Sequence, residues 1–280
     1  MPNAVLKRSM TVGQEAYKSV HTIRERTATV WRLSQLASHL ALGGMTSQLR
    51  GTIISKCGES RHLFESPYFQ GWLDRFVCLL KMDISLTGEQ YSEGGCLYVA
   101  NHISWIDAVA LAKVDHFSFV AKHEVRQWPV IGAISQQCKT VYINRHNKFS
   151  VYRSLPALSD HLKSGGRVLV FPEGTTSDGN QALPFYPMLF EAAVRASVPV
   201  QAISIRYTDP SNRPLPDVSF IDDDTVIDTL LRLLAHDRVI ANIEFLPIEM
   251  MSRCRKQLAQ RTREQIDRSL ELTKPPRQPN

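Results

Sequence analysis

From residue 96 onward, short apolar runs alternate with segments of helical periodicity, and this alternation constrains the fold more than any other feature of the chain. The predicted strands span residues 96–100, 117–122, 140–145, 167–172, 198–207 and 238–247. The predicted helices lie near residues 105–113, 129–137, 149–163, 186–196, 225–235 and 253–271. Strands that alternate with helices in this way are typical of an α/β protein, so we expect a mixed, largely parallel sheet flanked by helices.

An amphipathic helix is predicted ahead of this pattern, over residues 27–45. Its apolar residues recur at helical spacing and are Val30, Leu33, Ala37, Leu40 and Ala41. Trp31 lies beside them, and Gly43-Gly44 is expected to end the helix. Such a helix either lies on a membrane surface or packs on its own domain, and the segment by itself leaves both open.

A second predicted helix, over residues 70–83, is too apolar to be exposed to water and must be covered by protein or by lipid. We expect three regions: an N-terminal helical, membrane-docking segment over residues 1–82, an α/β domain over residues 83–272 and a flexible tail over residues 273–280. No apolar run approaches the roughly 18 residues that a spanning helix needs, and the N-terminus lacks the apolar core of a signal peptide. We therefore expect a chain that does not cross a membrane, and the amphipathic helix over residues 27–45 is the candidate for lying on one.

The net charge of +6 is concentrated at the two ends of the chain. Residues 1–50 hold seven Lys or Arg against two Asp or Glu, and residues 252–280 hold eight against three, so each end carries +5 and the middle carries −4. Basic ends favour an anionic surface as partner, either a membrane or a nucleic acid. The lack of aromatic residues among the basic ones at the C-terminal end disfavours nucleic acid.

Several common chemistries have no signature in this chain. The five cysteines are scattered singly, without the paired spacing of a zinc site or the regular framework of a secreted scaffold, so a reducing compartment is expected and no metal is indicated. There is no G-x-S-x-G nucleophile elbow, P-loop, G-x-G-x-x-G or H-E-x-x-H.

The segment "NHISWID" brings a histidine and an aspartate close to the end of the predicted strand 96–100. If that strand ends at Asn101, His102 lies in a turn, Ser104 is the N-cap of the next helix and Asp107 is its third residue. His102 then folds back over the first helical turn toward Asp107. Alternatively, Ser-x-x-Asp is a capping-box pattern, in which Asp107 only satisfies free backbone donors.

The segment "FPEGTTSDG" follows a second predicted strand and turns sharply at Glu173-Gly174. Pro172 keeps the preceding residue extended, so the strand runs directly into the turn. Such a turn can aim the Glu173 carboxylate and the backbone N–H groups of residues 174–176 at one point. An ordinary polar loop leaving a strand is the alternative interpretation.

Together these segments resemble the lysophospholipid acyltransferases, whose best-known members are the 1-acylglycerol-3-phosphate acyltransferases. "NHISWID" matches the N-H-x-x-x-x-D box of that family, and "FPEGTTS" matches its F-P-E-G-T box at the usual separation. "AKHEVRQWPVIG", "VYINR" and "VPVQAISIRY" are similar to three further family segments. The resemblance covers roughly residues 75–210.

The resemblance implies a role for each residue of these boxes. His102 is the expected general base on the acceptor hydroxyl, and Asp107 is expected to fix its tautomer and to favour the imidazolium that forms, so no protein nucleophile is required. Glu173, Gly174 and Thr175 are implied to bind the acceptor.

Two cations are further candidates for the acceptor head group. Arg145, at the end of the predicted strand 140–145, is expected at the carboxyl-end edge of the sheet, where it offers fixed positive charge. Lys122 is a weaker candidate, because a lysine after an apolar strand is commonly a solvated strand end.

One segment departs from the family pattern. Family members often carry Phe-Lys-x-Gly just after the F-P-E-G box, whereas this chain has "PFYPMLF", with Tyr186 and Met188 where Lys and Gly would stand. The departure removes or moves an anion contact and leaves the acyl-transfer chemistry untouched.

The resemblance predicts an O-acyltransferase that moves a fatty acyl group from acyl-CoA or acyl-carrier protein, as a substrate and without a cofactor, to the hydroxyl of a lysophospholipid. The expected acceptor is 1-acyl-sn-glycerol-3-phosphate, giving phosphatidic acid. The alternatives are another lysolipid, such as a lyso-ornithine lipid, and a non-enzymatic lipid-binding protein. We expect the enzyme on an anionic membrane surface, peripheral on the cytoplasmic face of a bacterial inner membrane.

Overall fold

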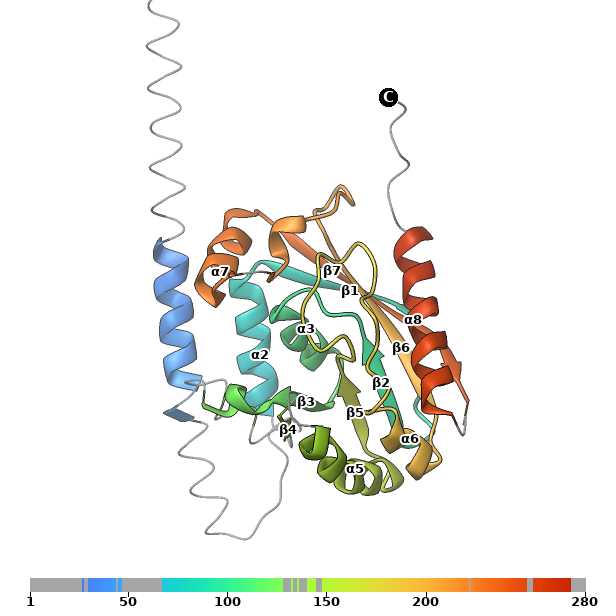
Figure 1. Ribbon diagram of the computed structural model, residues 1–280. Coiled ribbons are helices and arrows are strands. Elements are labelled where there is room, and N and C mark those ends of the chain that lie inside the picture. The colour runs from blue at the N-terminus through green and yellow to red at the C-terminus, as the bar shows by residue number, and fades with distance from the viewer. Residues whose placement is uncertain are drawn as a thin grey trace, which may run out of the picture.

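The structure is a computed structural model, and it describes residues 27, 30–43, 45–46, 67–127, 132, 135, 140–144, 148–221, 223–250 and 254–272. These residues form a seven-stranded sheet in the order β1-β7-β6-β2-β5-β3-β4 (Figure 1). The strands are β1 (Met82–Gly88), β2 (Cys96–Ala100), β3 (Ser118–Lys122), β4 (Val141–Ile143), β5 (Arg167–Val170), β6 (Val200–Thr208) and β7 (Val239–Glu249). The helices are α2 (Pro67–Leu79), α3 (Ile106–Val114), α5 (Lys148–Lys163), α6 (Glu191–Ala196), α7 (Val226–Ala235) and α8 (Arg255–Leu272), with short 3-10 helices at His123–Gln127 and Pro216–Val218.

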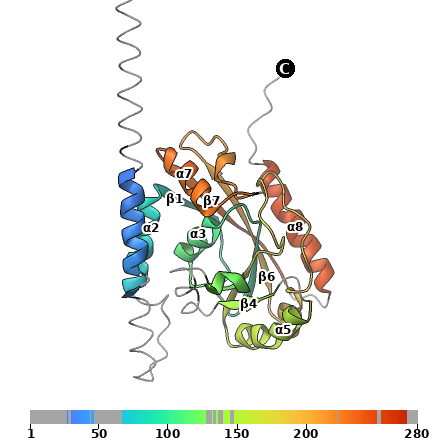
Figure 2. The same cartoon turned by 60° about the vertical axis from the view of Figure 1, so that its left-hand side comes forward.

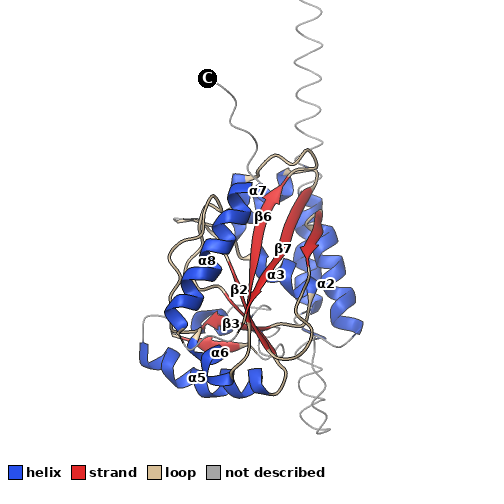
Figure 3. Ribbon diagram, turned by 90° about the vertical axis from the view of Figure 1, so that its right-hand side faces the viewer, coloured by secondary structure: helices blue, strands red, loops and turns tan. Residues whose placement is uncertain are grey.

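The sheet is mixed and largely parallel, which confirms the predicted fold class. Strands β6, β2, β5, β3 and β4 are mutually parallel, whereas β7 runs antiparallel to β6 and pairs in parallel with β1. In the parallel part, the carboxyl ends of neighbouring strands therefore meet at one edge of the sheet. Figure 3 shows this sheet between its flanking helices.

Helices cover both faces of the sheet (Figures 1 and 2). The central strand β2 is buried completely, and its side chains alternate between two apolar clusters. Leu97 and Val99 belong to the cluster that contains residues of α5, α6 and α8. Tyr98 and Ala100 belong to the cluster that contains residues of α2, α3 and α7. The segment that follows β2 thus starts from a completely buried strand.

Strand β1 was not predicted, and the helix predicted over residues 70–83 is shorter at its C-terminal end. Helix α2 ends at Leu79, and Lys81 adopts a positive φ of 51°, after which β1 begins at Met82. β1 is an edge strand whose residues are mostly exposed, and it gains its hydrogen bonds from β7, more than 150 residues away in the sequence. No local apolar pattern marks such a strand.

Two other predicted helices also differ. The helix expected over residues 186–196 is confined to α6, because residues 187–190 form turns. The helix expected over residues 129–137 falls outside the described residues except for Gly132 and Ser135, which are helical.

The N-terminal helix, described over residues 30–43 and 45–46, buries part of the predicted apolar stripe. Its side chains toward the domain are Leu33, Leu36 and Leu40, of which only Leu36 is fully buried. Val30, Ala37 and Ala41, the other residues of the predicted stripe, are exposed. The predicted stripe is therefore only partly buried, because periodicity alone does not select the face that meets α2.

The contact between the N-terminal helix and α2 is built from aromatic rings. The His39 imidazole stacks on Trp72, with ring centroids 5.0 Å apart, and Trp72 stacks on Phe76 at 5.5 Å. Gly43 lies against the Trp72 indole, which donates to the His39 carbonyl at 3.3 Å. Residues 45 and 46 are helical, so Gly43 does not end the helix, and its role is to admit the ring. The apolar residues of α2 are therefore largely covered by protein.

None of the described helices is both long enough and apolar enough to cross a bilayer.

Gly43→Ala is expected to destabilise the protein. A Cβ at position 43 would lie 2.1 Å from Nε1 of Trp72, and the stacked rings leave the indole no room to retreat. Overpacking of this kind costs about 1–3 kcal/mol. Gly71→Ala is the matched control, because a Cβ in the middle of α2 meets nothing within 4 Å and should stabilise the helix by up to about 1 kcal/mol. Thermal melts of the two variants that shift in the same direction would contradict this packing.

Candidate active site

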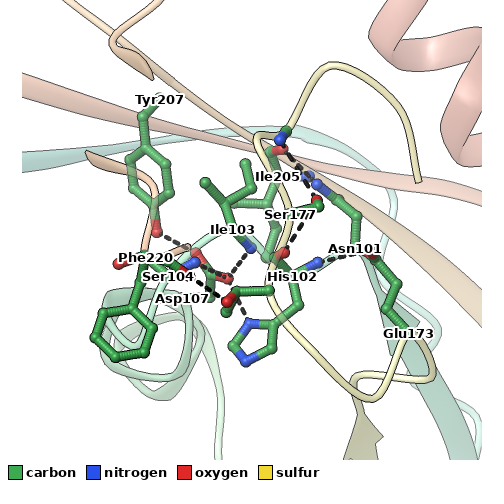
Figure 4. A network of polar contacts seen from close by, with 12 residues as sticks. Asn101, His102, Ile103, Ser104, Asp107, Glu173, Ser177, Ile205, Tyr207 and Phe220 are labelled. Atoms are coloured by element: carbon green, nitrogen blue, oxygen red, sulfur yellow. Dashed lines mark hydrogen bonds and ion pairs between the residues drawn. The ribbon is translucent and has the colours of Figure 1, made fainter. Parts of the chain in front are cut away.

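The turn that carries His102 is fixed to the sheet by Asn101, directly after β2. The buried side-chain amide of Asn101 donates to the carbonyl of Ile205 at 2.9 Å and accepts from the N–H of the same residue at 2.8 Å (Figure 4). The side chain thus continues the pairing between β2 and β6 where the backbone leaves the strand. The position of the following residue is consequently set by the sheet.

His102 lies before helix α3 and folds back toward Asp107, as the spacing of the two residues predicted. Its Nδ1 is 2.7 Å from Oδ2 of Asp107, and its ring stacks on Phe171 with centroids 4.1 Å apart. An ionised carboxylate only accepts, so Nδ1 carries the ring proton and Nε2 keeps its lone pair. The imidazole is therefore held by its edge and its face, with Nε2 left to accept a proton.

Asp107 is completely buried and accepts four hydrogen bonds. Oδ2 accepts from Nδ1 of His102 and also from the backbone N–H groups of Ile103 at 2.7 Å and Ser104 at 3.0 Å. Oδ1 accepts from the hydroxyl of Tyr207 at 2.7 Å. Four donors compensate for removing the carboxylate charge from water.

The predicted N-cap role of Ser104 is wrong. Helix α3 begins at Ile106, and its N-cap residue, Trp105, makes no side-chain cap. The buried Ser104 hydroxyl has no hydrogen-bond partner among the described residues. Only the carboxylate half of the capping box is present, because Asp107 accepts from backbone donors while it also holds His102. Asp107 therefore both pairs with His102 and satisfies backbone donors, so each of the two interpretations of the spacing is partly correct.

Glu173 links the turn of the F-P-E-G box to the turn of His102. Its Oε1 accepts from the backbone N–H of His102 at 2.7 Å, and its Oε2 accepts from that of Leu183 at 3.1 Å. The side chain is 3% exposed, and burial raises the pKa of this carboxyl to about 7, against the two backbone donors, which lower it. The carboxyl group thus makes contacts that position the backbone of the site.

The loop after Glu173 also holds the backbone of the catalytic turn. The backbone N–H of Ser177 donates to the carbonyl of His102 at 2.8 Å, and the Ser177 hydroxyl donates to the same oxygen at 3.2 Å. Thr176 donates from its hydroxyl to the carbonyl of Phe220, whose own N–H donates to the carbonyl of Ile103 at 2.9 Å. The residues around His102 are therefore clamped by two chain segments that are distant in sequence (Figure 4).

The other predicted binding residues make none of the contacts given above, and Arg145 is outside the described residues. Lys122 ends β3, is about half exposed and lies 3.6 Å from the Glu124 carboxylate, as expected for a solvated strand end. Thr175 is exposed, and Gly174 adopts a φ of 74° beneath the ring of Tyr186. The acceptor-binding roles of all these residues remain predictions.

Three residues of the network were not singled out from the sequence, namely Asn101, Ser177 and Tyr207. Asn101 directly precedes His102 at the end of an apolar run, which is a detectable signal for a residue that closes a strand. Tyr207 ends the apolar run 198–207 and gives no local sign that it meets Asp107, a hundred residues earlier in the chain. Among the described residues, no three His, Cys, Asp or Glu side chains are grouped to hold a metal ion.

Known proteins similar to this chain agree with the fold and the motifs. A family model described as Acyltransferase matches residues 83–206. The chain is 36% identical over 194 residues to the 1-acyl-sn-glycerol-3-phosphate acyltransferase of Neisseria meningitidis serogroup B. The aligned region covers 68% of this chain and 72% of that protein. It is 33% identical over 210 residues to the lyso-ornithine lipid O-acyltransferase of Pseudomonas aeruginosa, and this aligned region covers 74% of this chain and 80% of that protein.

A solved structure also has this fold. The crystal structure of the 1-acyl-sn-glycerophosphate (LPA) acyltransferase PlsC from Thermotoga maritima matches with a TM-score of 0.66 at 18% identity, over 92% of this chain and 99% of that one. The fold and the relatives together place the chain among the acyltransferases. It belongs to the lysophospholipid acyltransferase family that its motifs indicated, and it is an O-acyltransferase.

The free energy of unfolding is expected to depend on pH through the buried carboxyl of Glu173. Its pKa is raised from 4.5 to about 7, so between these values the folded protein holds a proton that the unfolded chain releases. The contribution of this group is therefore complete below pH 4.5 and lost as the pH rises through about 7. Relative to Glu173→Gln, which cannot titrate, the free energy of unfolding of the native protein should fall by about 3 kcal/mol over this window.

Urea denaturation at a series of pH values measures this difference. The side chain of Glu173→Gln has one accepting oxygen instead of two, so it loses one of the two backbone hydrogen bonds, but that loss is the same at every pH and leaves the slope unchanged. Glu264→Gln, at an exposed position of α8, is the control for the substitution itself. A difference for Glu173→Gln that is flat, or that grows with pH, would contradict the raised pKa.

Proposed function

We propose that the protein transfers a fatty acyl group from a thioester donor, acyl-CoA or acyl-carrier protein, to the free hydroxyl of a lysolipid. The observation that carries this proposal is the 2.7 Å contact between Nδ1 of His102 and the buried carboxylate of Asp107. It leaves Nε2 as a base, oriented by a fixed negative charge, in a protein of the acyltransferase family. A protein that only bound lipid would have no need for this arrangement.

The reaction follows from the roles of the two side chains. Nε2 of His102 takes the proton of the acceptor hydroxyl as its oxygen attacks the thioester carbonyl. The tetrahedral intermediate then collapses, the carbon–sulfur bond breaks, and the imidazolium returns its proton to the departing thiolate. Asp107 remains ionised throughout and stabilises the imidazolium, as the aspartate does in a serine-protease triad whose serine is replaced by the substrate hydroxyl.

The first candidate acceptor is 1-acyl-sn-glycerol-3-phosphate, with phosphatidic acid as product. It is supported by the name of the Neisseria relative and by Arg145 and Lys122 as candidate cations for a phosphate head group. Glu173 is included in this proposal as a residue that positions the turn of His102, because its carboxylate already accepts from two backbone N–H groups.

A lyso-ornithine lipid is a second candidate, favoured by one specific observation. Tyr186 stands where many family members carry lysine, its side chain is largely exposed, and its ring lies over Gly174. A neutral ring offers no charge to a phosphate, whereas it can contact an ammonium group through its face. The Pseudomonas relative, named for this acceptor, aligns with 74% of the chain. A panel of purified lysolipids with labelled donor, analysed by product mass, decides between the two acceptors.

The N-terminal helix is the proposed membrane-docking element, on the cytoplasmic face of a bacterial inner membrane. Its outward side exposes four large apolar side chains, Val30, Trp31, Leu42 and Met45. The first 50 residues carry +5, which attracts them to anionic lipid. Trp72 of α2, which is within the predicted docking segment 1–82, packs against His39 of the N-terminal helix and is left out of the docking face.

His102→Ala is expected to abolish acyl transfer without unfolding the protein, because a general base contributes about 10²–10⁴-fold and Nε2 is the one group placed for this role among the described residues of the network. Asp107→Asn should also lose most of the rate, since the amide can hold the wrong tautomer. Steady-state kinetics and a thermal melt of each variant give the test. His102→Ala protein that keeps more than about a tenth of the native rate would refute the assignment.

Trp31→Ser is expected to weaken sedimentation with anionic vesicles by about tenfold, since an exposed indole contributes apolar area to an interfacial helix. Activity on a short-chain, water-soluble lysolipid should not change, because Trp31 is not part of the His102 network. Tyr152→Ser, which removes an exposed aromatic residue from α5, is the matched control and should bind vesicles normally. Equal binding by the two variants would exclude the N-terminal helix as the docking element.

A further inference from the structure

Asp107 has a hydrogen-bond partner that comes from a distant part of the chain. Three of its four donors belong to residues 102–104, within five positions of Asp107 itself, and all three point to Oδ2. The fourth donor is the hydroxyl of Tyr207 near the carboxyl end of β6, 2.7 Å from Oδ1. Tyr207 is 3% exposed, and Figure 4 shows its ring reaching toward the carboxylate from the side opposite His102.

The local donors alone do not fix both ends of the carboxylate. Oδ2 is held by two backbone N–H groups and the imidazole, whereas the hydroxyl of Tyr207 is the donor that the described residues supply to Oδ1. Without that hydroxyl, a charged oxygen would be buried without a partner, and rotation of the carboxylate to a better-solvated position would shift Oδ2 away from the imidazole. The geometry of His102 therefore depends on the far oxygen of Asp107.

Strand β6 holds the turn at two points that are two residues apart. Ile205 pairs through its backbone with the side chain of Asn101, and Tyr207 reaches Asp107 with its hydroxyl. Residues two apart on a strand are separated by about 7 Å. The two contacts are made by Asn101 and Asp107, so they hold the two ends of the segment 101–107. The orientation of the His102 ring is thus tied to the central sheet.

We infer that Tyr207 is a positioning residue for acyl transfer: by donating to Oδ1 it locks the Asp107 carboxylate in the orientation that keeps the His102 proton on Nδ1. This inference rests on the proposed role of His102 as the base. Burial and the charge of Asp107 hold the pKa of Tyr207 well above its ordinary value, so the hydroxyl stays protonated and always donates.

Tyr207→Phe removes the hydroxyl and keeps the ring, and it is compared with Tyr98→Phe as a matched control. Tyr98 is fully buried in the same apolar cluster, and its hydroxyl donates at 2.7 Å to the carbonyl of Tyr91. Each variant thus loses the hydroxyl of a buried tyrosine together with its hydrogen bond, but only Tyr207→Phe affects Asp107. Both are assayed at a temperature where circular dichroism shows them folded.

For Tyr207→Phe we expect kcat to fall by about 10- to 100-fold, the effect of losing a hydrogen bond to a charged group, with the KM of both substrates changed less than about twofold. Tyr98→Phe should keep the native kcat. Nitrogen NMR of ring-labelled histidine should show a smaller population of the His102 tautomer protonated on Nδ1 in Tyr207→Phe, and no such change in Tyr98→Phe. If Tyr207→Phe does not fold, difluorotyrosine at position 207, which keeps the shape but is a stronger acid, must shift the His102 Nδ1 resonance.

The inference is overturned if Tyr207→Phe and Tyr98→Phe have the same kcat, if the loss lies in KM alone, or if neither change at position 207 alters the His102 spectrum. His102→Ala separates this failure from that of the proposed function. An inactive His102→Ala with a fully active Tyr207→Phe would refute only the role of Tyr207. An active His102→Ala would refute the proposed base itself.

Discussion

The buried carboxylate of Asp107 is the interaction on which the rest of the site depends. A charge that is fully removed from water is tolerated only if hydrogen bonds replace its hydration, and here four donors do so. The same bonds fix the turn between β2 and α3, the first turn of the helix and the ring of His102. The hydrogen bonds that stabilise the buried charge of Asp107 are thus the same ones that orient the catalytic residue.

The second carboxyl of the site acts through the backbone. Glu173 joins the His102 turn to the loop that follows β5, and Ser177 of that loop closes on the carbonyl of His102. Loops at the carboxyl edge of a parallel sheet are exposed and variable in most α/β proteins. Here the two loops are bonded to each other, so the base is held by a framework that spans β2, β5 and β6.

The N-terminal helix has one side packed on the domain and one side that is exposed. Its inner side packs on α2 through Leu36, His39 and Gly43, while Trp31 faces outward. The inner contact is built from stacked rings and a close approach at glycine, which fixes the helix to the catalytic domain. As the docking element that we propose, the helix would be joined firmly to the catalytic domain.

The sequence by itself determined the α/β architecture and predicted the pairing of His102 with Asp107 as one of two interpretations, because strand alternation and a contact across five residues are local properties of the chain. It also indicated the family, since five motifs in order carry that information. Tertiary structure alone decided the partner of Oδ1, the edge strand β1 and the inner face of the N-terminal helix. Tyr207 meets Asp107 through the sheet, β1 exists through its pairing with β7, and Leu36 rather than Ala37 is buried because α2 lies on that side. Each of these contacts joins residues far apart in sequence, whose meeting depends on strand order and helix packing that no local pattern encodes.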